Sequence, residues 1–221
     1  MQETDETRAC ERTKRSFDRF VNFSDAVFAI AITLLALDVR LPTIDTSALA
    51  PPLAPQLPGL VPNLFAFMLS FVVIGGYWVS HHSLFKMIDR SDMRLVWLNL
   101  LVLFFIVLLP VPTQIVADYG NTTLGVEIYA GAITLTGLSM LALIAYAYRS
   151  HLTAPEANIR VALVKSSLTP LVFGSSMIVA IWSPAWATRM WWLVAFAYFV
   201  VDPMLNSDWG RLRRRKKAVG S

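Results

Sequence analysis

Long apolar segments constrain this chain more than any other feature of its sequence. The segment Leu60–Leu84 (LVPNLFAFMLSFVVIGGYWVSHHSL) contains no Asp, Glu, Lys or Arg. A helix needs about 20 mostly apolar residues to cross the hydrocarbon core of a bilayer. Six segments have about this length, at 20–39, 60–84, 94–116, 124–148, 161–182 and 187–206. None shows the alternation of a membrane β-strand, so the sequence predicts an all-α integral membrane protein with six transmembrane helices.

The composition leaves little room for anything else. Of the 221 residues, 56% are hydrophobic and 15% are charged, whereas a soluble domain averages about 45–50% and about 25%. The six segments occupy most of the chain, so we exclude a sizeable soluble catalytic domain and do not expect an enzyme. We divide the chain into a cytoplasmic N-terminal tail (1–19), a six-helix transmembrane domain (20–206) and a basic cytoplasmic tail (207–221).

Basic residues predict the orientation. All of the 19 Lys and Arg residues except Arg40 and Arg189 lie in the two tails, in the loop after the second segment or around the loop after the fourth. Positively charged loops remain on the cytoplasmic side, so both termini are expected there. The C-terminal run RLRRRKK fits contact with anionic lipid, and we expect no nucleic-acid partner.

The first segment carries one apolar stripe. On a helix with about 100° per residue, Ile30, Leu34 and Leu37 fall within about 60° of one another, and Thr33 lies beside them. By itself, such a stripe is what ordinary helix packing produces. Asp25 projects away from it.

Asp25 lies about one turn inside the membrane, where a carboxylate requires a polar partner. Trp78 and His82 are four residues apart and share a helix face, and Asn99 is expected at a similar depth. From this spacing we choose His82, and not His81, as the histidine of the polar cluster around Asp25. The cluster could be a structural hydrogen-bond network, a proton relay, or a metal or catalytic site. Adjacent histidines project about 100° apart, which argues against a shared metal ion.

Four motifs identify a known family. RxxxFSD (Arg19 to Asp25) opens the first segment, and YWVSHH at Tyr77–His82, WLNLL at Trp97–Leu101 and LLPVPT at Leu108–Thr113 follow. Together they resemble the transmembrane protein 175 family of potassium-permeable channels.

This resemblance implies a function and a set of site residues. A chain with one six-helix repeat is similar to prokaryotic members, which are multi-pass proteins of the plasma membrane and assemble as homotetramers. The first helix of each subunit would line the pore for permeant potassium, and no cofactor is implied. The implied constriction is Ile30, Leu34 and Leu37, with Thr33 in ion coordination. The implied structural network is Arg19, Phe23, Ser24, Asp25, Trp78, His82 and Asn99.

Apolar rings can close a pore by dewetting. The sequence contains no TVGYG-like filter, so we expect only modest selectivity for potassium over sodium, set by pore width, hydration and Thr33. One alternative is a proton-coupled secondary transporter that uses Asp25 and His82. Another is a membrane scaffold that does not conduct.

Overall fold

The computed structural model describes residues 2–37, 39, 60–154 and 159–196, and every regular element among them is a helix. The first helices are α1 (Gln2–Leu37), α2 (Val61–Phe85), α3 (Met93–Leu108) and α4 (Pro110–Tyr119). They are followed by α5 (Thr123–Arg149), α6 (Ile159–Ala180), α7 (Pro184–Met190) and α8 (Trp192–Phe196). The only strand-like pairing within these ranges is an isolated bridge between Ile88 and Thr153.

Five stretches of the described chain are long and apolar enough to cross a membrane. They are Arg15–Leu37, Val61–Phe85, Met93–Tyr119, Thr123–Arg149 and Ile159–Ala180. The predicted all-α, multi-pass membrane fold is therefore confirmed. The predicted sixth segment, 187–206, contains part of α7 and all of α8, and its remainder lies outside the described residues, as does the basic tail 207–221.

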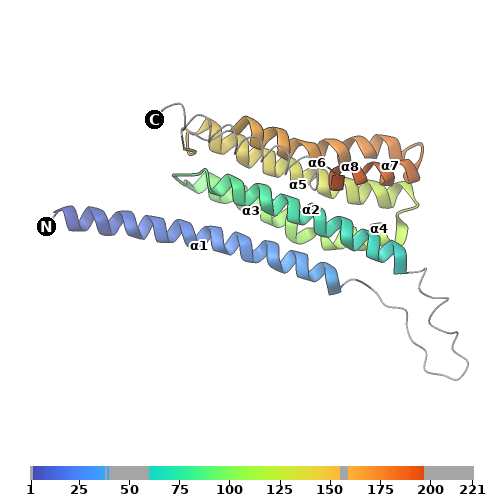
Figure 1. The fold of residues 1–221 in the computed structure, drawn as a ribbon, viewed down its shortest axis with the longest axis horizontal. Coiled ribbons are helices and arrows are strands. Elements are labelled where there is room, and N and C mark those ends of the chain that lie inside the picture. The colour runs from blue at the N-terminus through green and yellow to red at the C-terminus, as the bar shows by residue number, and fades with distance from the viewer. Residues whose placement is uncertain (1, 38, 40–59, 155–158, 197–221) are drawn as a thin grey trace, which may run out of the picture.

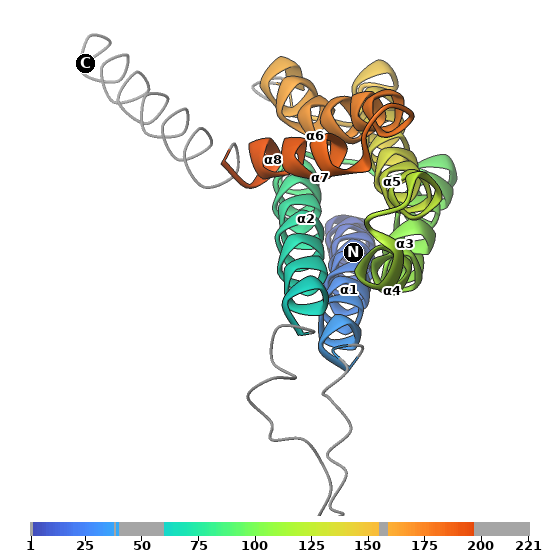
Figure 2. The same ribbon diagram turned by 90° about the vertical axis from the view of Figure 1, so that its right-hand side faces the viewer.

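The helices run side by side, and α1 forms one edge of the bundle (Figure 1). It contacts α2, α3 and α4, whereas α5 and α6 form the most extensive helix pair. Helices α7 and α8 lie between α6 and α2 (Figure 2). Helix α1 is continuous from Gln2, so it does not break at the predicted boundary after residue 19.

The third span contains a helix break at Leu109. Pro110 and Pro112 have no backbone N–H, so the regular hydrogen-bond ladder cannot continue through them. The N–H and the hydroxyl of Thr113 both donate to the carbonyl oxygen of Leu109, at 3.1 and 2.8 Å. This satisfies a buried carbonyl and allows α4 to continue the span begun by α3.

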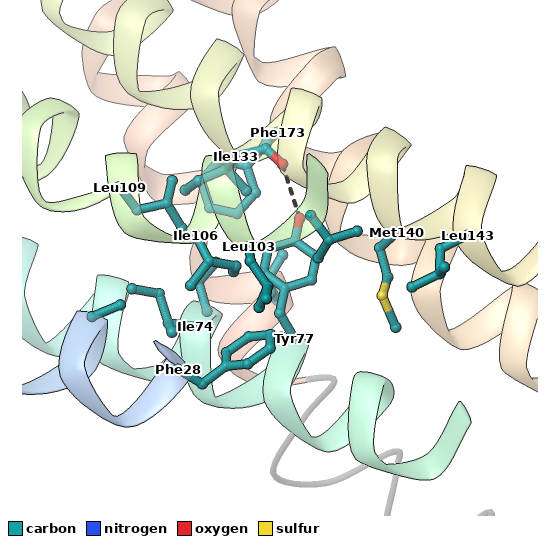
Figure 3. Close-up of a cluster of buried hydrophobic side chains, with 14 of the residues drawn as sticks. Phe28, Ile74, Tyr77, Leu103, Ile106, Leu109, Ile133, Met140, Leu143 and Phe173 are labelled. Atoms are coloured by element: carbon teal, nitrogen blue, oxygen red, sulfur yellow. Dashed lines mark hydrogen bonds between the residues drawn. The ribbon is translucent and has the colours of Figure 1, made fainter. Parts of the chain in front are cut away.

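The core lies between α2, α3, α5 and α6 and also receives α1 (Figure 3). Ile74, Ile106 and Phe173 are fully buried there. Tyr77 is also buried, and its hydroxyl donates to the carbonyl oxygen of Ile133 at 2.9 Å. This bond joins α2 to α5 in surroundings where an unpaired hydroxyl would be costly.

The loops after α2 and after α5 lie at the same end of the bundle. The N–H of Asp89 donates to the carbonyl oxygen of Leu152 at 2.9 Å, and the N–H of Ala154 donates to that of Met87 at 2.8 Å. The ring of Phe20 lies 5.7 Å from that of Phe85, which places the N-terminal half of α1 at this end as well. The predicted basic loops are thus neighbours.

Close packing of α5 on α6 depends on Gly137. A Cβ atom there would lie 2.8 Å from three ring atoms of Pro170, whereas one at Gly75 would meet nothing within 4 Å. We expect Gly137→Ala to lower the free energy of unfolding by about 1–3 kcal/mol, because the proline ring cannot yield without moving α6. Unfolding in an SDS titration measures the loss. The matched control is Gly75→Ala, and equal losses in the two variants would contradict this packing.

A carboxylate fixes the start of α3. Asp92 is its N-cap, and Oδ1 accepts the N–H of Leu95 at 2.8 Å. The hydroxyl of Tyr146 in α5 donates to Oδ2. This bond, together with the Leu95 N–H, holds the pKa of the Asp92 carboxyl below its ordinary value of 3.8. A lowered pKa in the folded state stabilises the protein above the ordinary value, and this stability is lost as the pH falls through the folded-state pKa.

We therefore expect Tyr146→Phe to lower the apparent melting temperature mainly above about pH 5, with the difference from the parent protein shrinking as the pH falls below 3.8. Thermal unfolding in detergent across this range measures it. The control is Tyr148→Phe, because Tyr148 lies two residues further along α5 and its side chain is exposed. A loss that does not change with pH would show that the bond to Asp92 is not its cause.

Candidate functional site: the first helix and its supports

The predicted stripe on α1 faces away from its own subunit. Ile30, Leu34 and Leu37 are 57%, 39% and 79% exposed. Phe28 and Leu35, on the other side of the helix, are almost completely buried. The stripe is therefore free to meet lipid, another subunit or a pore.

Thr33 lies beside this stripe and is also exposed. Its hydroxyl donates to the carbonyl oxygen of Ile30 at 2.9 Å. A hydroxyl that donates its proton still has lone pairs available. Because the hydroxyl proton points to the helix backbone, the lone pairs of the Thr33 oxygen are free to coordinate a cation beside the exposed face of α1.

A buried hydrogen-bond chain joins α1, α2 and α3. The Asn99 amide donates from Nδ2 to the Ser24 hydroxyl oxygen at 2.9 Å, and its Oδ1 lies 2.6 Å from Nε2 of His81. The Ser24 hydroxyl in turn donates to the carbonyl oxygen of Phe20 at 3.2 Å. All three polar side chains are fully buried. Because the amide oxygen can only accept, Nε2 of His81 carries the proton.

The histidine that pairs with Asn99 is His81 and not the predicted His82. The two rings project about 100° apart on α2, and His81 is the one that points inward, between the rings of Phe28 and Phe85 at 5.2 and 4.4 Å. The spacing argument correctly placed Trp78 and His82 on one face, where their rings stack at 5.3 Å. That face is the more exposed one, because Trp78 is 37% exposed.

Asp25 belongs to this second group. The indole Nε1 of Trp78 donates to Asp25 Oδ1 at 2.9 Å. The residues predicted as one network therefore form two, a buried chain of Ser24, Asn99 and His81 and a more exposed group of Asp25, Trp78 and His82. Arg19 and Phe23 are exposed and lie outside both hydrogen-bonded groups. In the described ranges, no three His, Cys, Asp or Glu side chains gather closely enough to hold a metal ion.

A further polar cluster, not predicted from the sequence, lies deep in the bundle. The Ser70 hydroxyl is 2.8 Å from both the Thr113 and the Tyr129 hydroxyls, which joins α2, α4 and α5. The Tyr129 ring packs against Trp191, whose Nε1 donates to the Ser176 hydroxyl at 2.9 Å. The sequence gives one indication of this cluster, since its members are polar residues in the middle of apolar segments. Ser70 and its partners are 43 and 59 residues apart, however, so they do not form a recognisable motif.

The fold and the exposed stripe define the class, a multi-pass helical membrane protein whose first helix is only partly covered by its own subunit. Residues 19–110 match the family model described as endosomal/lysosomal potassium channel TMEM175. This match contains every predicted site residue from Arg19 to Asn99. The predicted family resemblance is thus confirmed for this part of the chain.

Individual relatives agree with this assignment. A protein named as a potassium channel from Streptomyces collinus is 41% identical over 131 residues, covering 59% of this chain and 62% of the relative. A second relative named as a potassium channel, from Chamaesiphon minutus, is 36% identical over 119 residues, covering 51% of this chain and 57% of the relative. Matches thus span about three fifths of these relatives. The crystal structure of a lysosomal potassium-selective channel TMEM175 homolog from Chamaesiphon minutus superimposes with a TM-score of 0.71 at 26% identity, covering 85% of this chain and 97% of that one.

The position of the two histidines leads to a prediction. His81→Ala should lower the free energy of unfolding by about 1–3 kcal/mol, because it leaves the buried Asn99 oxygen without a donor. His82→Ala removes a partly exposed ring and should cost less. SDS titration of the two variants side by side measures the difference. A larger loss for His82→Ala would show that the buried chain is not the stronger support of α1.

Proposed function

We propose that the chain is one subunit of a homotetrameric, potassium-permeable cation channel of a prokaryotic plasma membrane, with α1 of each subunit lining the pore. The exposed stripe of Ile30, Leu34 and Leu37 carries this proposal. Only 22% of the most apolar stretch of α1 is buried within the subunit, compared with 28% for α6, 44% for α2 and 50% for α5. Four such helices around an axis would bury these faces against one another and against the permeation path.

The chemistry of the stripe fits a passive pore. Rings of Ile30, Leu34 and Leu37 would give a narrow apolar constriction that closes by loss of water. Thr33 would supply hydroxyl oxygens beside it. Such a site has no fixed ring of backbone carbonyls, so selectivity for potassium over sodium is modest. No enzymatic step is involved.

The orientation follows from the charges. The loop after α2, which contains Lys86 and Arg90, lies at the same end of the bundle as the loop after α5 and the N-terminal part of α1. Positive loops stay in the cytoplasm, so this end is cytoplasmic and the constriction lies toward the opposite side of the membrane.

The alternative of a proton-coupled transporter receives less support from the geometry. Asp25 accepts a hydrogen bond from Trp78, and His82 stacks on the same indole. Both residues hold an aromatic ring at the α1–α2 contact, which is a structural role. His81, which is buried, pairs with Asn99.

Flux assays in liposomes separate these functions. Purified protein in potassium-loaded vesicles should release potassium down its gradient at the same rate with and without a proton gradient. Flux that stops when the proton gradient is removed would establish the transporter instead. Absence of flux from correctly assembled protein would instead support the alternative of a membrane scaffold that does not conduct.

The constriction can be tested by widening it. Leu34→Ala should raise potassium flux several-fold and reduce the preference over sodium, because a smaller ring lowers the barrier to wetting. Ile30→Asn should do the same by adding a polar group. The matched control is Leu168→Ala on α6, since Leu34 and Leu168 are each 39% exposed. Unchanged flux in both α1 variants, with assembly intact, would refute the constriction.

A further inference from the structure

The outer face of the α1–α2 pair has a notch at Gly75. A Cβ atom built on Gly75 would meet nothing within 4 Å, so the space beside this residue is open. Phe71 and Trp78, four residues before it and three after it, share its face of α2 and are exposed. On α1, Ala29 lies one turn beyond Asp25, which bonds Trp78, and it carries only a methyl group. The notch is thus an open position between two large aromatic side chains.

A bulky side chain protrudes from the other flank of the subunit. Phe104 on α3 is 60% exposed. It projects about 140° away from Asn99, the residue of α3 that bonds α1 and α2. Leu101 and Leu108, three and four residues from Phe104, are exposed on the same face. Helices α2 and α3 lie on opposite flanks of α1 (Figure 2), so Phe104 points away from the notch of its own subunit.

The notch and Phe104 lie at the same depth in the membrane. The bonds of Asn99 to Ser24 and to His81 place these three residues at one level. Gly75 is six residues from His81, and Phe104 is five residues from Asn99, both toward the end of the bundle away from the basic loops. At about 1.5 Å per residue, the two positions lie about 9 Å and about 7.5 Å from that level. Their depths therefore differ by about 1.5 Å.

We propose that Phe104 of each subunit inserts into the notch at Gly75 of the neighbouring subunit, between the Phe71 and Trp78 side chains. The inference rests on the proposed function, because it requires a tetramer with α1 at its axis. Rotation about an axis normal to the membrane keeps every residue at its own depth. A side chain on one flank therefore meets only residues of equal depth on the next subunit. Because the contact joins two different surfaces, repeating it around the axis closes a ring.

The chemistry of the contact suits association within a bilayer. Lipid chains are as apolar as a phenyl ring, so helices associate in a membrane through close packing at small residues. A ring at the Gly75 position contacts helix backbone that a larger residue would cover. It also lies between two aromatic side chains, which attract a third ring in edge-to-face or offset arrangements. Packing of this kind distinguishes the notch from the surrounding lipid.

Thiol cross-linking tests the contact directly. The full chain has a single cysteine, Cys10, which is first replaced by serine. The variant Gly75→Cys/Phe104→Cys is then treated in detergent with a short bifunctional maleimide. We expect a ladder of covalent dimers, trimers and tetramers on denaturing gels, because each subunit presents one cysteine to each neighbour. Either cysteine alone should give no ladder, since identical positions do not meet in this contact.

The matched control keeps the notch cysteine and moves the other one. Gly75→Cys/Leu171→Cys places it at an exposed position of α6, on the side of the bundle away from α1 (Figure 2), and should give no ladder. An equal ladder from this control would overturn the proposal. So would the absence of cross-linked dimers from the first pair in protein that is tetrameric by light scattering.

Exchanging the two side chains provides an independent test. Phe104→Ala removes the inserted ring, and Gly75→Phe fills the notch. Each should raise the concentration at which half of the tetramer dissociates at least tenfold, whereas Leu171→Ala should change it less than twofold. Gly75→Phe/Phe104→Gly should recover most of the loss, because residues in contact are coupled. A double variant no better than Gly75→Phe alone, or a tetramer unaffected by Phe104→Ala, would show that Phe104 faces lipid.

Potassium flux from the same preparations separates this contact from the proposed function. A parent protein that conducts as a tetramer, but whose cysteine pair gives no ladder, refutes the contact and retains the channel. A cross-linked tetramer without flux retains the contact and refutes the channel. A parent protein that is monomeric or only dimeric refutes both.

Discussion

The hydrogen bonds of Asn99 are the interaction on which the arrangement of α1 depends. One amide side chain donates to Ser24 on α1 and accepts from His81 on α2, so three helices are tied at a single point. Individual hydrogen bonds between membrane helices contribute only about 0.6–2 kcal/mol. Their importance here is directional, since they fix the rotation of α1 about its own axis. Every assignment of its exposed face follows from that rotation.

Aromatic packing supports the same rotation. Phe28 is buried against the His81 ring, and Phe17 and Phe20 contact Phe85 near the end of α2. The Trp78–Asp25 bond adds a second polar tie on the more exposed side of the contact. Both ties lie in the half of the span nearer the basic loops, whereas Ile30, Leu34 and Leu37 lie beyond them. The part of α1 held by these bonds is thus distinct from the part proposed to line the constriction.

The remaining helices are joined by close packing and by buried hydrogen bonds. Gly137 allows α5 to approach Pro170 on α6, and the Ser70, Thr113 and Tyr129 hydroxyls join α2, α4 and α5 in the interior. An unpaired hydroxyl at these positions would be costly, so the cluster permits few alternative packings. A packed interior with a lightly covered helix, α1, at its edge is an arrangement suited to association through that helix.

The sequence alone determined five of the six predicted spans, the all-α class, the stripe on the first helix and the motif residues. These features depend on local hydrophobicity and on the fixed angle between successive residues of a helix. It placed Trp78 and His82 on one face for the same reason. Helical periodicity gives only relative angles. Whether that face pointed into the bundle depended on contacts with Phe28 and Asn99, which lie on other helices. Only the tertiary structure could therefore select His81, reveal the Ser70 cluster and show that α1 is one helix from Gln2 to Leu37.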